Sequence, residues 1–278
     1  LVKKIVYLED GDYVLVNKNA ITIYDKNHKP IHRNEYNVNL DFGHISKDGY
    51  RHFMEKEIFE QPSVLVNTIS SLISVDNKIN INLSKIGTKR NAGLMICAAG
   101  TSYYAAIIAK YWIEKISNVM VNVELASEFR YRKPSINGLS AMIVISQSGE
   151  SIDTLMAMRE GKRLKLKTTS IVNVEGSTID RESDYSIYTR VGAEIGVAST
   201  KSFTSQLTVL FLLALKLAED NKTISQTNFK KMIECVKSLP SSLSKLLTIN
   251  EKIIELAQKI KNAENVLFLG RGVLYPLA

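Results

Sequence analysis

The sequence predicts an α/β fold in which a doubly wound parallel sheet with flanking helices follows a short antiparallel β segment. Two apolar runs, at residues 92–99 and 141–145, lack the alternation of a half-exposed strand, so they fit parallel strands covered on both faces. Each run leads into a turn rich in hydroxyl groups and then into a helical pattern, and a third apolar run begins at Lys167. This repeated order of strand and helix indicates a right-handed parallel sheet.

Length and composition limit the classes of protein that need to be considered. The chain has 278 residues, which suggests about two domains, and its 45% hydrophobic content is ordinary for a protein with a core. The net charge of +8 comes from Lys and Arg interleaved with acidic residues, and no helix-turn-helix or basic-aromatic pattern accompanies it. We therefore expect small anionic ligands and no nucleic-acid partner. Because no apolar run approaches the ~20 residues of a membrane span, we also expect a cytoplasmic protein with no membrane partner.

The cysteine and histidine residues indicate neither a disulfide framework nor a metal site. Cys97 and Cys235 lie in apolar segments without a CxxC motif, and the chain has only four histidines. We expect both cysteines to be core residues.

The first 40 residues have the pattern of short antiparallel strands. Apolar and polar residues alternate, with turn signals at residues 10–12 and 18–19. A β segment this short cannot bury a core of its own. The stretch from Asn37 to Gly49 is rich in Asn, Asp, Gly and Lys, which is typical of a linker.

Helical spacing follows, and then the first strand-to-helix turn. Apolar residues between Phe53 and Leu72 recur at helical spacing, and we expect Pro62 to divide this stretch into two helices. The strand at residues 92–99 leads into Gly100, Thr101 and Ser102, with a helix predicted from Tyr103 to about Lys115 and another strand at residues 119–125.

The turn after residues 141–145 is the strongest local signal of a ligand site. Hydroxyl and amide side chains surround Gly149 where a helix begins, and the positive end of a helix dipole favours a phosphate. Alternatively, Ser148 or Ser151 simply caps the helix, while Glu150 and Asp153 complement its dipole. Thr101 and Ser146 lie 45 positions apart, and such turns meet at the carboxyl edge of a parallel sheet.

Three further elements are expected in the C-terminal third. Ser199 and Thr200 are predicted to cap a long apolar helix ending near Ala218. Lys201 falls in its first turn, where the dipole disfavours a cation, so it is either a solvated surface residue or the partner of an anion or carboxylate. Residues 225–261 have the pattern of two amphipathic helices broken at Pro240, and residues 265–270 of a strand that starts a second α/β unit.

Several of these segments resemble the sugar isomerase (SIS) domain, a flavodoxin-like fold, of the glutamine-fructose-6-phosphate aminotransferase family. They are GTSYYAA, EFRYRKP, SQSGESIDT, AEIGVASTKSFTSQL and LFLGRGVLYPLA, and the run GYRHFMEKEIFEQP is similar to the family's entry into its synthase half. The resemblance implies that residues 1–40 end a glutaminase domain, 41–52 form a linker, 53–220 the first SIS domain, 221–264 connecting helices and 265–278 the start of a second SIS domain.

The resemblance also assigns binding residues. The family's ligands of the sugar phosphate match Thr101, Ser102, Ser146, Gln147, Ser148 and Ser151, and its contacts near the other end of the sugar match Val197 and Ser199. Ala99 and Ser151 stand where the family usually has Cys and Thr, and neither difference removes a hydroxyl. The implied ligands are fructose 6-phosphate and glucose 6-phosphate, the implied assembly is a homodimer through the SIS domains, and no cofactor or metal is implied.

The implied function is that of an enzyme portion. Family members convert fructose 6-phosphate and glutamine into glucosamine 6-phosphate and glutamate in hexosamine (UDP-GlcNAc) synthesis. Their glutaminase nucleophile is an N-terminal cysteine, whereas Leu1 stands here, and their catalytic lysine, glutamate and histidine follow the segment that matches residues 271–276. We therefore expect no complete catalytic set within these 278 residues. The alternative is a module that senses sugar phosphates by binding alone.

Overall fold

The computed structural model describes residues 4–37 and 46–278, and the chain divides into two compact units. They are an N-terminal unit, Leu1–Ser46, and a sheet unit, Lys47–Ala278. Most of the predicted linker, at residues 38–45, lies outside the described residues.

The N-terminal unit consists of short antiparallel strands, as predicted. Strand β1 (Lys4–Val6) pairs with β5 (Glu35–Asn37), while β2 (Tyr13–Val16), β3 (Ile21–Tyr24) and β4 (Pro30–Ile31) form a second small sheet. The Arg33 guanidinium donates two hydrogen bonds, of 2.9 and 3.0 Å, to the Asp12 carboxylate.

The sheet unit contains five parallel strands, which confirms the predicted fold class. They are β6 (Gly93–Ala98), β7 (Val121–Leu125), β8 (Leu139–Ser146), β9 (Lys167–Val172) and β10 (Tyr185–Tyr188). Their spatial order is β7-β6-β8-β9-β10, so the strand order reverses between β6 and β8, as in flavodoxin-like sheets. Strand β10 was not predicted from the sequence, because four residues are too few to show a periodicity.

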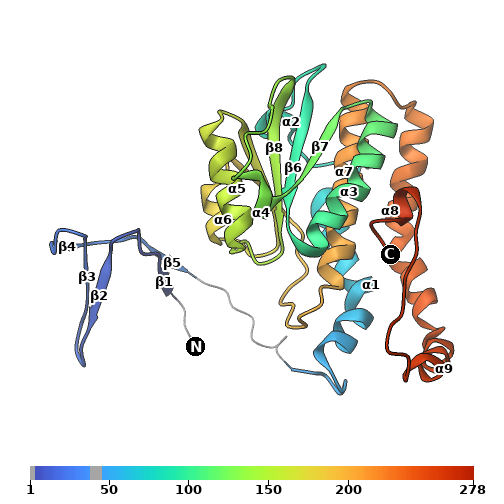
Figure 1. Ribbon diagram of the computed structural model, residues 1–278, viewed down its shortest axis with the longest axis horizontal. Helices are drawn as coiled ribbons and strands as arrows, with labels where there is room; N and C mark the ends of the chain where they lie inside the picture. The colour runs from blue at the N-terminus through green and yellow to red at the C-terminus, as the bar shows by residue number, and fades with distance from the viewer. Residues whose placement is uncertain (1–3, 38–45) are drawn as a thin grey trace. The chain divides into compact units, whose positions relative to one another are not determined.

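Helices cover both faces of this sheet (Figure 1). One face is covered by α1 (Phe53–Leu72), α3 (Gly100–Ser117) and α7 (Lys201–Asp220), with α8 (Gln226–Leu247) packed against α1, and the other by α4 (Ala126–Phe129), α5 (Ile152–Arg163) and α6 (Thr178–Glu182). The short helix α2 (Leu83–Ile86) precedes β6. Successive residues of β8 alternate between the two cores, Met142 toward α5 and Ile143 toward α7.

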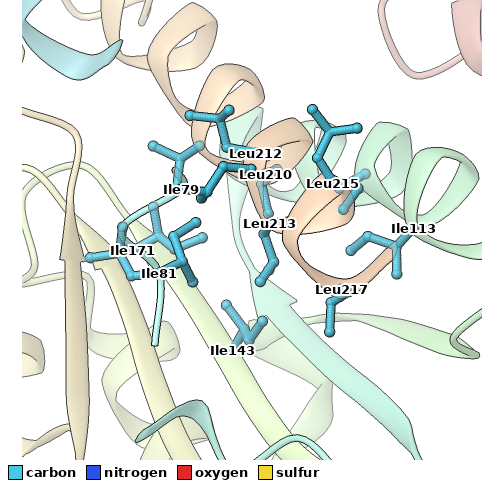
Figure 2. Close-up of a cluster of buried hydrophobic side chains, with 14 of the residues drawn as sticks. Ile79, Ile81, Ile113, Ile143, Ile171, Leu210, Leu212, Leu213, Leu215 and Leu217 are labelled. Carbon is cyan, nitrogen blue, oxygen red and sulfur yellow. The ribbon is translucent and has the colours of Figure 1, made fainter. Parts of the chain in front are cut away.

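Helix α7 is the centre of the larger core. Its leucines lie over Ile143 and Ile171 of the sheet (Figure 2). In the described part of the chain it is the one helix long and apolar enough to cross a membrane, but 67% of its most apolar window is buried within the protein. Packing against α1, α3 and the sheet therefore accounts for its composition.

Both prolines predicted to break helices lie inside continuous helices. Pro62 lacks the N–H that would bond the Ile58 carbonyl, and the Gln61 side-chain amide donates to that carbonyl instead, at 3.1 Å. Pro240 lies within α8, and the break falls at residues 248–249, before α9 (Asn250–Ile260). The prediction was wrong at both positions because side-chain bonds and packing can compensate for one missing backbone bond.

Three smaller expectations also differ from the structure. Helix α3 begins at Gly100 rather than Tyr103. Cys97 is buried as predicted, whereas Cys235 is exposed. Residues 265–270 form no strand, because they pair with no strand of the described chain and Leu267 and Leu269 are over 80% exposed. The 3-10 helix η2 (Gly272–Leu274) follows them.

Candidate functional site

A cavity of about 350 Å³ lies at the carboxyl ends of β6 and β8, where the strand order of the sheet reverses. This is the position at which open α/β sheets bind their ligands. All eight residues predicted from the sequence line it, and they come from three segments of the chain. The lining residues are Ala99, Gly100, Thr101, Ser102, Ile145, Ser146, Gln147, Ser148, Ser151, Thr154, Val197, Ala198 and Ser199.

The first segment is the turn from β6 into α3. Gly100 has a φ of +57°, and an added Cβ there would meet nothing within 4 Å. Ala99, at the N-cap, has no side chain that can accept a hydrogen bond from the backbone N–H groups of the first turn. Those groups and the Thr101 and Ser102 hydroxyls therefore form one donor-rich side of the cavity.

The second segment is the turn from β8 into α5. The Ser146 Oγ accepts a hydrogen bond from the Gly149 backbone N–H at 3.0 Å and lies 3.0 Å from the Ser151 Oγ. The Ser148 Oγ accepts from the Glu150 N–H at 3.1 Å. Each backbone donor occupies an oxygen lone pair, so the hydroxyl proton of Ser148 stays available for a ligand.

The capping alternative for this turn matches the structure only at Asp153, which lies in the first turn of α5. Ser151 occupies the N-cap of α5, yet its side chain accepts no capping bond from the described backbone. The Glu150 carboxylate accepts from the Thr178 N–H at 2.7 Å, so it caps α6 rather than complementing α5. The first-turn amides of α5 thus have no side-chain cap.

Thr154 belongs to this turn, although the predicted site residues did not include it. Its side chain lines the cavity and is 1% exposed, and its hydroxyl has no hydrogen-bond partner in the described chain. A buried hydroxyl without a partner costs free energy, so the Thr154 hydroxyl is a donor that a ligand in the cavity would satisfy. The sequence pattern that could have identified Thr154 as a site residue is its position three residues after Ser151, on the same face of α5.

The third segment is the cavity loop, residues 189–200, which connects β10 to α7. It contributes Val197, Ala198 and Ser199 to the lining. The prediction that Ser199 and Thr200 cap α7 was wrong. The Glu194 carboxylate accepts from the Thr200 and Ser202 N–H groups, each at 3.1 Å, and from the Ser199 hydroxyl at 3.1 Å.

Lys201 has a carboxylate partner, so the surface alternative is excluded. Its side chain is buried and its Nζ lies 2.8 Å from the Glu60 carboxylate of α1. The same carboxylate lies 3.4 Å from the Lys56 Nζ, which also pairs with Asp48 at 2.8 Å. These ion pairs offset the unfavourable position of a cation at the start of α7.

Hydroxyls and backbone dipoles, rather than charged side chains, give the cavity its electrostatic character. None of the described lining residues is Lys, Arg, His, Asp, Glu or Cys. The N-termini of α3 and α5 both meet the cavity, and two helix dipoles favour an anion there. Cys97 is the penultimate residue of β6, close to this site in the sequence, but burial raises the pKa of its thiol and so disfavours the nucleophilic thiolate.

Comparison with known proteins agrees with the family resemblance found in the sequence. Residues 89–216 match the SIS domain family. Glutamine-fructose-6-phosphate aminotransferase (isomerizing) of Idiomarina loihiensis is 42% identical over 281 residues, which cover 99% of this chain and 46% of that protein. The Fusobacterium nucleatum aminotransferase of the same name is 41% identical over 273 residues, covering 98% of this chain and 45% of the relative. The chain belongs to the glutamine-fructose-6-phosphate aminotransferase family.

A solved structure agrees with the assignment to the aminotransferase family. The C-terminal domain of glucosamine-fructose-6-phosphate aminotransferase from Francisella tularensis is 39% identical, with a TM-score of 0.79 over 84% of this chain and 66% of that one. The chain spans about half the length of the aminotransferases that it matches.

Proposed function

We propose that the SIS domain binds fructose 6-phosphate or glucose 6-phosphate, with the phosphate between the two strand-to-helix turns and the sugar toward Val197 and Ser199. We propose further that the chain is the isomerase portion of an enzyme that converts fructose 6-phosphate and glutamine into glucosamine 6-phosphate and glutamate. The observation that carries this proposal is the meeting of two uncapped helix N-termini and eight hydroxyl or amide side chains in one cavity.

A phosphate accepts hydrogen bonds, so its site must supply donors. Backbone N–H groups at helix N-termini and hydroxyl protons such as that of Ser148 are donors of this kind. The buried Thr154 hydroxyl is a further donor in need of a partner. On the resemblance to the aminotransferase family, we extend the proposal to a homodimer through the SIS domains and to a cytoplasmic location.

A second candidate function is a sugar-phosphate sensor. The described cavity lining includes no group that titrates near neutral pH, whereas isomerisation requires a positioned base. Binding without chemistry would need only the donors described above. The two functions differ in one measurement: production of glucosamine 6-phosphate from fructose 6-phosphate and glutamine by the full-length protein supports the enzyme, and saturable binding without product supports the sensor.

Binding itself is tested by thermal unfolding and calorimetry. Fructose 6-phosphate and glucose 6-phosphate should raise the melting temperature more than free fructose, because a ligand that binds only the native state stabilises it. Ser148→Ala should weaken binding about tenfold or more, the value of one hydrogen bond to a charged group. Ser70→Ala, on the exposed side of α1, is the control. Equal shifts with phosphorylated and free sugar would contradict the phosphate assignment.

A further inference from the structure

The cavity loop forms one wall of the site without any helix or strand of its own. Residues 189–200 carry no regular structure, and Val197 is fully exposed, so packing of its side chain does not hold it in place. The positions of Val197, Ala198 and Ser199 therefore depend on the bonds made by the backbone on either side of them.

On the N-terminal side, the loop is held by Glu57 of α1. The carboxylate is 2% exposed, and its Oε1 accepts hydrogen bonds from the Ile195 N–H at 2.6 Å and the Gly196 N–H at 3.0 Å. A Cβ added to Gly196 would lie 2.5 Å from the Glu57 Oε2, so only glycine permits this approach. Glu57 and Gly196 lie 139 positions apart in the sequence.

On the C-terminal side, Glu194 folds back onto the start of α7. It accepts the Thr200 and Ser202 N–H groups and the Ser199 hydroxyl. The three cavity-lining residues thus lie between two carboxylate anchors, one supplied by the loop itself and one by α1. Charge-assisted bonds of this kind are stronger than neutral ones, so the two carboxylates hold the cavity-lining residues from both sides.

In the described chain the buried Glu57 carboxylate bonds to backbone N–H groups of the loop, and the buried lysines near it in the sequence pair with other carboxylates. Lys56 and Lys201 are each under 5% exposed, and Glu60 pairs with both of them. Asp48 pairs with Lys56 from the surface. A buried carboxylate is tolerated when donors satisfy its oxygens, and the Ile195 and Gly196 N–H groups do so for Glu57.

We infer that Glu57 is a positioning residue for sugar recognition: it does not line the cavity, but it sets the place of Val197 and Ser199 against the sugar. The inference rests on the proposed function and adds a residue to it. Because the phosphate is assigned to the β6 and β8 turns, Glu57 should influence the sugar end of the ligand and leave phosphate binding unchanged.

The test compares the affinities of the 278-residue chain for fructose 6-phosphate and for inorganic phosphate. Glu57→Ala should weaken fructose 6-phosphate binding about tenfold, since it removes hydrogen bonds to a charged group, with inorganic phosphate binding unchanged. Glu57→Gln keeps one acceptor oxygen and should restore part of the loss. Glu114→Gln is the matched control, because Glu114 also accepts a backbone N–H, from Val121 at 3.1 Å, but at the other end of α3.

A second variant reaches the same contact from the loop. Gly196→Ala leaves α1 intact and forces the Glu57 carboxylate away, so it should reproduce the Glu57→Ala result even if Glu57→Ala does not fold. If the unmodified protein binds fructose 6-phosphate, either of two results would overturn the inference. One is an unchanged affinity for fructose 6-phosphate in the folded variants, and the other is an equal loss of affinity for fructose 6-phosphate and for inorganic phosphate. Absence of binding by the unmodified protein would reject the proposed function and the inference together.

Discussion

Replacing Gly149 by alanine should destabilise the sheet unit more than replacing Gly100 by alanine, although both glycines lie in strand-to-helix turns with positive φ. The φ values are +68° and +57°, and each substitution costs about 1–2 kcal/mol for placing a side chain in the left-handed region. At Gly100 the new methyl group meets nothing within 4 Å. At Gly149 it would lie 1.9 Å from the Ser177 Oγ and 2.5 Å from its Cβ.

A small shift of the turn cannot relieve the overlap at Gly149. The Gly149 N–H is bonded to the Ser146 Oγ, and its carbonyl accepts from the Ile179 N–H at 2.9 Å, so the turn cannot move without losing these bonds. Overpacking adds about 1–3 kcal/mol, which gives about 2–5 kcal/mol for Gly149→Ala against about 1–2 kcal/mol for Gly100→Ala.

Urea unfolding followed by tryptophan fluorescence measures this difference. The chain has a single tryptophan, Trp112, which packs edge-on against Phe211 in the sheet unit, so its signal reports on this unit. Adding Ser177→Gly should restore part of the stability of Gly149→Ala, because it removes the overlap and leaves only the strain in φ. Equal free energies of unfolding for Gly149→Ala and Gly100→Ala would refute the reasoning.

Two further predictions concern a hydroxyl and an ion pair. Thr154→Val should keep or raise stability, by up to about 1 kcal/mol, because it removes a buried hydroxyl without a partner, yet it should weaken sugar-phosphate binding in calorimetry. Thr169→Val, at an equally buried hydroxyl outside the cavity lining, should leave affinity unchanged, and equal losses in both would contradict the role of Thr154. The hydrogen bond from Arg159 lowers the pKa of Glu182, so this pair stabilises the fold above the usual glutamate pKa and loses its effect as the pH falls through the lowered value. Arg159→Met should therefore lower the melting temperature at pH 7, by an amount that shrinks as the pH falls below the usual glutamate pKa, and a difference independent of pH would disprove the linkage.

The parallel sheet and most of the candidate site could be predicted from local sequence patterns. Uniformly apolar runs mark strands buried on both faces, and the hydroxyl groups that follow two of them mark the carboxyl edge of the sheet. Because parallel strands bring their carboxyl ends together, Thr101 and Ser146 could be placed side by side without knowledge of any contact between them. Both lie in the cavity lining.

Local patterns failed where a distant partner or a neighbouring side chain decides the outcome. Pro62 has the local signal of a helix break, but the Gln61 amide and the packing of α1 keep the helix whole. Residues 265–270 have the composition of a strand, but a strand forms only when another pairs with it.

The amino-acid sequence alone determined the fold class and the chemistry of the cavity, because periodicity and residue type are local properties. Only the tertiary structure decided how the cavity loop is held. Glu57 and Glu194 appear in the sequence as ordinary acidic residues, and neither was predicted to contribute to the site. The hydrogen bonds of Glu57 join residues 138 and 139 positions apart, and such a contact exists only after α1 and the loop have packed together.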